Sequence, residues 1–230
     1  LGESFGEEKL RDLARIATGS SAAEVDAAVR KARALARAAK RELRLEDLRA
    51  QFVAGDVVGA AWIRRAAIHE CGHAIVAAAL GCGEVMRVGL SDSGGTTTRR
   101  LVRQQNLLAD FEDELASGLA GRAAERMVFG DVCGGAGGPE DSDLARATKL
   151  AVSIDTLFGL GVYGPLWIET PPEVVLRDPE ARARIRIRLE AAEDRAGAIL
   201  AIHRQHLEAM AGGLARERLL AGEALAAWLA

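Results

Sequence analysis

The five residues 69–73, His-Glu-Cys-Gly-His, constrain this chain more than any other stretch of it. On an α-helix, side chains four positions apart lie one above the other on the same face. His69 and His73 can therefore reach one metal ion, and Glu70 can reach a water molecule beside that ion. This arrangement is typical of zinc hydrolases, in which a carboxylate takes the proton of the attacking water. The alternative is a helix with two partly exposed histidines and a solvated glutamate.

Composition favours a helical protein that acts on something other than nucleic acid. Hydrophobic residues make up 49% of the chain, enough for a substantial core, and aromatic residues only 4%. Ala, Leu and Arg dominate, which favours helix over sheet. The net charge is −3 and no long basic run occurs, so we expect no nucleic-acid partner.

The three cysteines, Cys71, Cys82 and Cys133, predict neither a disulfide framework nor a zinc ribbon. Their number is odd and no Cys-x-x-Cys pair occurs. Cys71 lies between the two motif histidines and would point away from a metal that both of them bind. We therefore expect Cys71 to be a packing residue in a protein of a reducing compartment.

No stretch of the sequence approaches the ~20 apolar residues that span a bilayer, and no signal peptide is recognisable. We therefore expect this chain by itself to be soluble. It begins with Leu1 and not with Met, which favours an excised piece of a longer protein. Membrane segments or further domains would then lie before Leu1.

Hydrophobic periodicity predicts a series of helices separated by glycine-rich breaks. In the first helical unit, Ser20 or Ser21 can cap the second helix, with Glu24 at capping-box distance from Ser21. The motif helix is expected to end at the Gly-Cys-Gly of residues 81–83. The helical stretches are residues 8–50, in three helices, then 60–80, 104–129, about 141–157, and two or more helices over 179–229 with a break at Gly212-Gly213.

Two short strands, at residues 85–90 and 96–98, are expected to form the only sheet of note. An edge strand beside a protease cleft can bind an extended peptide by adding it as another strand. A hairpin that merely covers the core is the alternative, and the sequence favours neither.

A catalytic zinc needs a third protein ligand and one open position. Asp141 and Asp143 follow a glycine-rich loop and precede a helix, so either carboxylate is a candidate, and spacing does not separate them. Either could instead serve as a helix N-cap. His203 and His206 are three apart on a late helix and could form a second metal site, although such a pair is more often a polar helix face.

Four segments of the chain match, in order, those of a known family. Residues 66–74 are similar to its His-Glu-Ala-Gly-His-Ala helix, and residues 119–130 to its Gly-Gly-Arg-x-Ala-Glu-Glu-x-x-Phe-Gly segment. Residues 141–148 are similar to its Ser-Asn-Asp-Leu-x-x-Ala-Thr, and residues 158–166 match more loosely. The chain thus resembles the FtsH-type ATP-dependent zinc metalloproteases, the membrane-anchored AAA proteases.

The resemblance implies a mainly α fold with two parts. Residues 1–52 look like the end of the helical lid of an AAA ATPase module. Residues 60–230 look like the zinc metallopeptidase domain, helical with a small β-hairpin or sheet. The family's third zinc ligand maps to Asp143, and Glu125 maps to an acidic residue that orients a ligand from behind.

Several departures from the family pattern limit what carries over. The chain lacks a Gly-x-x-x-x-Gly-Lys-Ser/Thr phosphate loop, so ATP would act only through a nucleotide-binding core missing here. We therefore expect no ATPase activity from this chain alone. Arg126 replaces the second Glu of Ala-Glu-Glu, Ser142 replaces the Asn before the ligand Asp, and the loop at 134–140 diverges.

Together the motif and the resemblance predict a zinc endopeptidase in which His69, His73 and Asp143 hold Zn²⁺ and Glu70 is the general base. The resemblance further implies a homo-hexamer, unfolded or membrane-protein substrates, and a place on the cytoplasmic side of a membrane reached through segments absent from this chain. One alternative is a non-catalytic module retained for ring assembly or for holding a partner. The other is an unrelated helical metal-binding protein.

Overall fold

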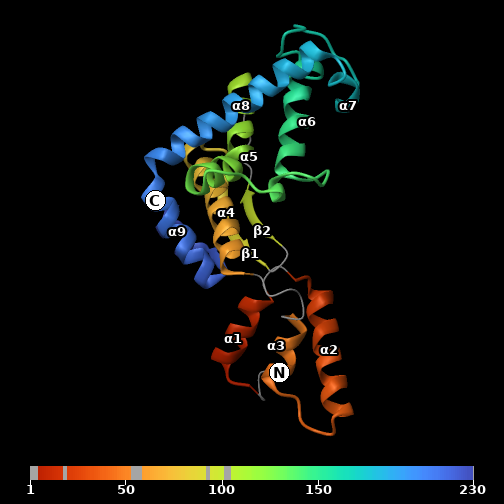
Figure 1. The fold of residues 1–230 in the computed structure, drawn as a ribbon, viewed down its shortest axis with the longest axis vertical. Helices are drawn as coiled ribbons and strands as arrows, with labels where there is room; N and C mark the ends of the chain where they lie inside the picture. Colours follow the sequence, from red (N-terminus) through yellow and green to blue (C-terminus); the bar gives the residue numbers. More distant parts are fainter. Residues whose placement is uncertain (1–4, 18–19, 53–58, 92–93, 101–104, 230) are drawn as a thin grey trace.

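The computed structural model describes residues 5–17, 20–52, 59–91, 94–100 and 105–229 (Figure 1). Over these ranges the chain is mainly helical, as predicted. The helices are α1 (Glu7–Ile16), α2 (Ala22–Ala38), α3 (Leu45–Phe52), α4 (Ala60–Leu80), α5 (Leu108–Phe129), α6 (Asp143–Thr156), α7 (Pro172–Val175), α8 (Pro179–Ile202), α9 (Arg204–Glu217) and α10 (Gly222–Leu229), and the strands are β1 (Glu84–Leu90), β2 (Gly95–Arg100) and β3 (Leu219–Ala221).

Helices α1 to α3 pack on one another around a small core of their own, which contains Leu13, Ala32 and Leu48. Figure 1 shows them together at one end of the long axis. Ser21 is the N-cap of α2: its hydroxyl accepts a hydrogen bond from the backbone N–H of Glu24, whose carboxylate accepts one from the N–H of Ser21. The predicted capping box is therefore confirmed, with Ser21 as the cap.

The central helix of the larger part is α4, which has the predicted bounds and carries the histidine motif. It ends at Gly81, whose φ of 67° is the left-handed conformation that glycine adopts at helix C-termini. Helices α5 and α9 pack against α4, and the long α8 crosses α5 (Figure 1). Buried residues of α4, α5 and α9 form the main core.

The sheet has three antiparallel strands in the order β2-β1-β3. The two predicted strands are confirmed, and within the described part of the chain β2 is an edge strand that pairs with β1 alone. The expectation of only two strands is wrong, because β3 pairs with β1 through Leu219, Leu220 and Ala221. Three residues are too few to show a sequence period, so only the folded chain reveals this strand.

The predicted helix break at Gly212-Gly213 is also wrong, since both glycines lie inside α9. The break occurs at His203, between α8 and α9. Each interior glycine costs a helix about 1 kcal/mol relative to alanine. Burial of Leu207, Met210 and Leu214 against the core offsets that cost.

The other predicted helices are observed with small shifts in their bounds. Helix α5 begins at Leu108, later than the predicted residue 104, and α6 begins at Asp143. Among the described residues, no helix has the length and apolar character needed to cross a membrane.

Candidate metal centre

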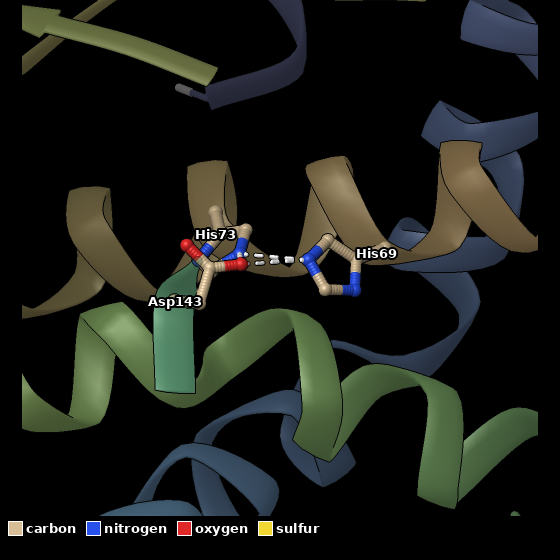
Figure 2. A group of neighbouring side chains, drawn as sticks. All are labelled: His69, His73 and Asp143. Carbon is tan, nitrogen blue, oxygen red and sulfur yellow. Dashed lines mark hydrogen bonds and ion pairs between the residues drawn. The ribbon is translucent and has the colours of Figure 1, made fainter. Parts of the chain in front are cut away.

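Three side chains from two helices converge on one point. His69 and His73 project from α4, and Asp143 from the first turn of α6 (Figure 2). The Oδ2 atom of Asp143 lies 3.1 Å from Nε2 of His69 and 3.2 Å from Nε2 of His73. The two Nε2 atoms are 3.1 Å apart. Four-residue spacing on α4 brings the histidines together, and packing of α6 adds the carboxylate.

These separations suit a single zinc ion. Ligands about 2.0–2.1 Å from Zn²⁺ in tetrahedral geometry lie roughly 3.3 Å from one another. The three observed distances, between 3.1 and 3.2 Å, are close to this value. Two imidazoles and one carboxylate leave a fourth position open, as in catalytic zinc sites. Among the described residues, His69, His73 and Asp143 are the set of side chains able to hold a metal together.

The second ring nitrogen of each imidazole, Nδ1, is hydrogen-bonded to an acceptor of the protein. Nδ1 of His69 lies 2.8 Å from Oε1 of Glu125, and Nδ1 of His73 lies 2.8 Å from the carbonyl oxygen of Ser117. Both partners are acceptors, so the proton is held on Nδ1 and Nε2 is left to bind a cation. This is the support that metal-ligating histidines have in proteins.

The two candidate aspartates separate in the structure. Asp143 lies against the histidines, whereas Asp141 only lines the surrounding cleft. Neither is the N-cap of α6, because the Ser142 hydroxyl accepts the bond from the N–H of Ala145. The second oxygen of Asp143, Oδ1, accepts a hydrogen bond from Arg146 at 2.7 Å. Oδ2 is therefore left as the single oxygen that faces the histidines.

Charge in the site is balanced for a cation. Burial disfavours the charged form of His69, but hydrogen bonds to Asp143 and Glu125 outweigh it and raise its pKa to about 9. Burial also opposes ionisation of Asp143, and its hydrogen bonds with both histidines nonetheless hold its pKa well below the usual range. The carboxylates of Asp143 and Glu125 thus stabilise positive charge at His69, as binding of a divalent cation there requires.

Glu70 lies next to this cluster of three side chains, on the side of the sheet. It is 8% exposed, and its Oε2 lies 2.7 Å from the hydroxyl of Thr97 on β2. A side chain at Gly95, also on β2, would overlap the Glu70 carboxylate. Strand β2 therefore packs directly on this glutamate and fixes its orientation.

Gly121 of α5 is another position at which a side chain has no room. A Cβ atom there would overlap the His69 imidazole, since α5 passes immediately beneath the ring. The close approach of α5 lets Glu125, one turn later on the same helix, reach Nδ1 of His69.

Glu125 is 1% exposed and is held by several donors. Arg65 donates to its Oε2 at 2.8 Å, and the backbone N–H of Cys133 donates to the same oxygen at 2.9 Å. Burial opposes its ionisation, but the bonds from His69, Arg65 and Cys133 prevail and lower its pKa to about 2. Glu125 is therefore an ionised carboxylate in contact with His69.

His69, His73, Asp143 and Glu70 line one cleft of about 860 Å³. Strand β2 forms one wall through residues 94–97, and α5 and α6 contribute the others. A cleft of this size, lined by both polar and apolar groups, admits a segment of polypeptide.

Other sequence candidates lie outside the site. His206 contacts the carbonyl of Trp228 and packs edge-on against its ring, and His203 joins α8 to α9. They form no metal-binding set with other described residues. Cys71 is fully buried in the main core, as predicted.

Comparison with known proteins identifies the family. The profile of peptidase family M41 matches residues 57–227. The chain belongs to peptidase family M41. Its mainly helical fold and its histidine-histidine-aspartate cluster agree with a zinc-dependent protease domain of this family. The expected resemblance is thereby confirmed, and the alternative of an unrelated helical metal-binding protein is wrong.

Relatives of this M41 chain include several curated proteases. It is 38% identical over 164 residues to the ATP-dependent zinc metalloprotease FtsH 1 of Symbiobacterium thermophilum, covering 67% of this chain and 27% of the relative. It is 31% identical over 251 residues to the FtsH of Pseudothermotoga lettingae, covering 94% and 39%. For the FtsH of Acidothermus cellulolyticus the identity is 30% over 243 residues, covering 91% and 35%. The chain thus spans only about a quarter to two fifths of the length of these relatives.

Sequence reasoning missed three residues of this M41 site. Thr97 lies in the predicted strand 96–98, where nothing in the sequence marks the contact of its hydroxyl with Glu70. Ser117 contributes a backbone carbonyl, which leaves no mark in a sequence. Arg65 did leave a signal, because it lies four residues before His69 and therefore on the same helix face.

Proposed function

We propose that this chain hydrolyses peptide bonds at a zinc ion held by His69, His73 and Asp143, with Glu70 as the general base. The observation that carries the proposal is the convergence of three ligand atoms within 3.2 Å of one another, beside a buried glutamate in an open cleft. Membership in a peptidase family supports the same reaction.

Each residue has a definite task in this reaction. Zinc, when bound, polarises the scissile carbonyl and lowers the pKa of water toward neutrality. Glu70 accepts a proton from the attacking water and delivers it to the leaving amine. Thr97 holds the Glu70 carboxylate in place, and Glu125 holds the His69 ring. Since the proton ends on the amine, Glu70 is again ionised for the next cycle.

The substrate is proposed to be an extended segment of protein that pairs with β2. Among the residues that the structure describes, this strand has a free edge in the sheet order β2-β1-β3, and residues 94–97 line the same cleft as the proposed ligands. A peptide added as a further strand would run past Glu70 with its backbone hydrogen-bonded. Because folded proteins rarely offer such segments, unfolded proteins or flexible parts of membrane proteins are the expected substrates.

The proposed partner is a further copy of this chain, in a homo-hexamer. Seven large side chains between residues 157 and 167 are more than a third exposed, and this stretch has no charged residue. At about 100 Å² for each half-exposed side chain, the surface approaches the ~800 Å² per partner of a stable interface. The seven are Leu157, Phe158, Leu160, Val162, Tyr163, Leu166 and Trp167.

Sedimentation tests this assembly. The chain is expected to sediment as an oligomer, and a Val162→Ser, Trp167→Ser double variant as smaller species with unchanged helical content. A wild-type chain that remains monomeric at high concentration would contradict the assembly proposal. The peptidase proposal would still stand.

We further propose two domains: a lid-like helical unit over residues 1–52 and a metallopeptidase domain over 60–230. The separate core of α1 to α3 supports this division. By likeness to the family, the protein would act on the cytoplasmic side of a membrane. Expression of residues 59–230 alone tests the division, since an independent domain should fold and bind zinc.

The decisive experiment for function compares zinc content and peptide cleavage in variants. Glu70→Gln should retain about one zinc per chain and lose cleavage by at least ~100-fold, as expected for loss of a general base. Asp143→Asn should lower zinc affinity, whereas Asp141→Asn, the matched control, should not. Wild-type protein that binds zinc but cleaves no flexible peptide would favour the non-catalytic assembly module.

A further inference from the structure

Arg65 is partly exposed, yet three side chains hold its guanidinium group. It lies on α4, one turn before His69, and its side chain is 25% exposed. Its Nη1 donates to Oε2 of Glu125 at 2.8 Å, and its Nη2 donates to Oδ1 of Asp131 at 2.7 Å. The guanidinium carbon also lies 4.3 Å from the centre of the Phe129 ring. Two carboxylates and one aromatic face therefore fix a single planar group.

Glu125 needs such a support to hold His69. The terminal torsion of a glutamate has a broad energy profile, so its carboxylate rotates readily unless both oxygens are engaged. Oε1 faces Nδ1 of His69, and Oε2 faces Arg65 and the N–H of Cys133. Loss of Arg65 removes one of two strong donors to Oε2 and weakens the control of Oε1.

From these contacts we infer that Arg65 is a positioning residue of the metal site, which acts through Glu125 to hold His69 in its metal-binding orientation. The inference rests on the proposed zinc site and adds a residue to it. The contacts begin at Phe129, the last residue of α5, and at Asp131 just after it. They continue through Arg65 and Glu125 to the imidazole of His69. The end of α5 and the residues after it are thereby coupled to the metal.

Substitution of Arg65 with glutamine tests the inference in the full chain. Loss of a partner that supports a metal-binding histidine typically lowers metal affinity 10- to 100-fold. Arg65 contacts Glu125 and not His69 itself, so its loss should have an effect at the lower end of this range. We expect Arg65→Gln to weaken zinc binding about tenfold in a competition titration with a chelator. The visible spectrum of the Co²⁺-loaded variant should also shift, because the geometry of His69 changes. Arg65→Lys keeps the positive charge but lacks the planar pair of donors that contacts both carboxylates, so it should give an intermediate zinc affinity.

Arg64 provides the matched control. It is the neighbouring arginine on α4, is exposed, and also lies near Phe129, 5.1 Å from the ring centre. It is not among the hydrogen-bond partners of Glu125 in the described part of the chain. Arg64→Gln should therefore leave zinc affinity and the Co²⁺ spectrum unchanged.

A second variant keeps the test valid if Arg65→Gln fails to fold. Asp131 is 71% exposed, so Asp131→Asn should fold normally and still loosen the guanidinium. A smaller loss of affinity in the same direction is expected. Wild-type affinity and spectrum in both variants would overturn the role of Arg65 and leave the zinc site intact. Failure of the wild-type chain to bind either metal would instead overturn the proposed function.

Discussion

At the scale of single residues, the site depends on hydrogen bonds that reach the motif from outside it. Thr97 is the clearest case, because its hydroxyl contacts the Glu70 carboxylate at 2.7 Å. Thr97→Val keeps the shape but removes the donor. We expect peptide cleavage to fall about tenfold with zinc content unchanged, since a hydrogen bond to a charged group contributes roughly 1.5–3 kcal/mol.

Thr97→Ser is the control for this effect and should retain most of the cleavage rate. Steady-state kinetics and metal analysis on the same preparations separate the two readouts. Equal rates for the valine variant and the wild type would mean that Glu70 needs no such support.

Gly121 makes a second prediction at this scale. A methyl group at this position would overlap the His69 ring, so Gly121→Ala should displace the imidazole and lower zinc affinity at least tenfold. Gly118 lies one turn earlier on α5 with open space around it. Gly118→Ala should bind zinc normally and unfold at the same or a slightly higher temperature. Equal zinc affinity in the two variants would show that α5 can move away from His69.

At the scale of elements, α9 shows how packing overrides local preference. Its two glycines suggested a break, yet the helix runs through them because its apolar face is buried against α4. Gly212→Ala should therefore stabilise the chain by up to about 1 kcal/mol, since the nearest atom to a new Cβ is a flexible arginine tip at 3.7 Å. Gly213→Ala should gain less, because the Trp228 ring lies at 3.4 Å. Denaturant unfolding measures both.

At the scale of the whole molecule, the three cysteines differ in their exposure to solvent. Cys133 is exposed, whereas Cys71 and Cys82 are buried. Burial disfavours the thiolate and raises the pKa of Cys82 to about 11, and that of Cys71 still further. Alkylation of the native protein at pH 8 should therefore label Cys133 alone, as read by peptide mass spectrometry.

The buried thiols should react only when the molecule opens. Their labelling rates should rise together in denaturant, because Cys71 lies in the main core. Rapid labelling of Cys71 without denaturant would contradict the burial of its thiol in the main core. Cys133→Ser provides the unlabelled reference for the exposed site.

Sequence reasoning was most successful where interactions are local. The bounds of α4, its glycine C-cap and the capping box of α2 each depend on residues within four positions of one another. The same spacing rule placed His69 and His73 on one face. The same rule places Arg65 on that face, four residues before His69.

Only the tertiary structure decided which groups from distant segments meet the motif. Asp141 and Asp143 are equivalent by spacing, and the entry angle of α6 brings only Asp143 to the histidines. The contact of Thr97 with Glu70 likewise follows from the packing of β2 on α4. The sequence by itself thus determined the histidine pair, because helix geometry repeats every few residues. The contacts of Asp143 with the histidines and of Thr97 with Glu70 depended on the packing of segments 27 to 74 residues apart, which no local period encodes.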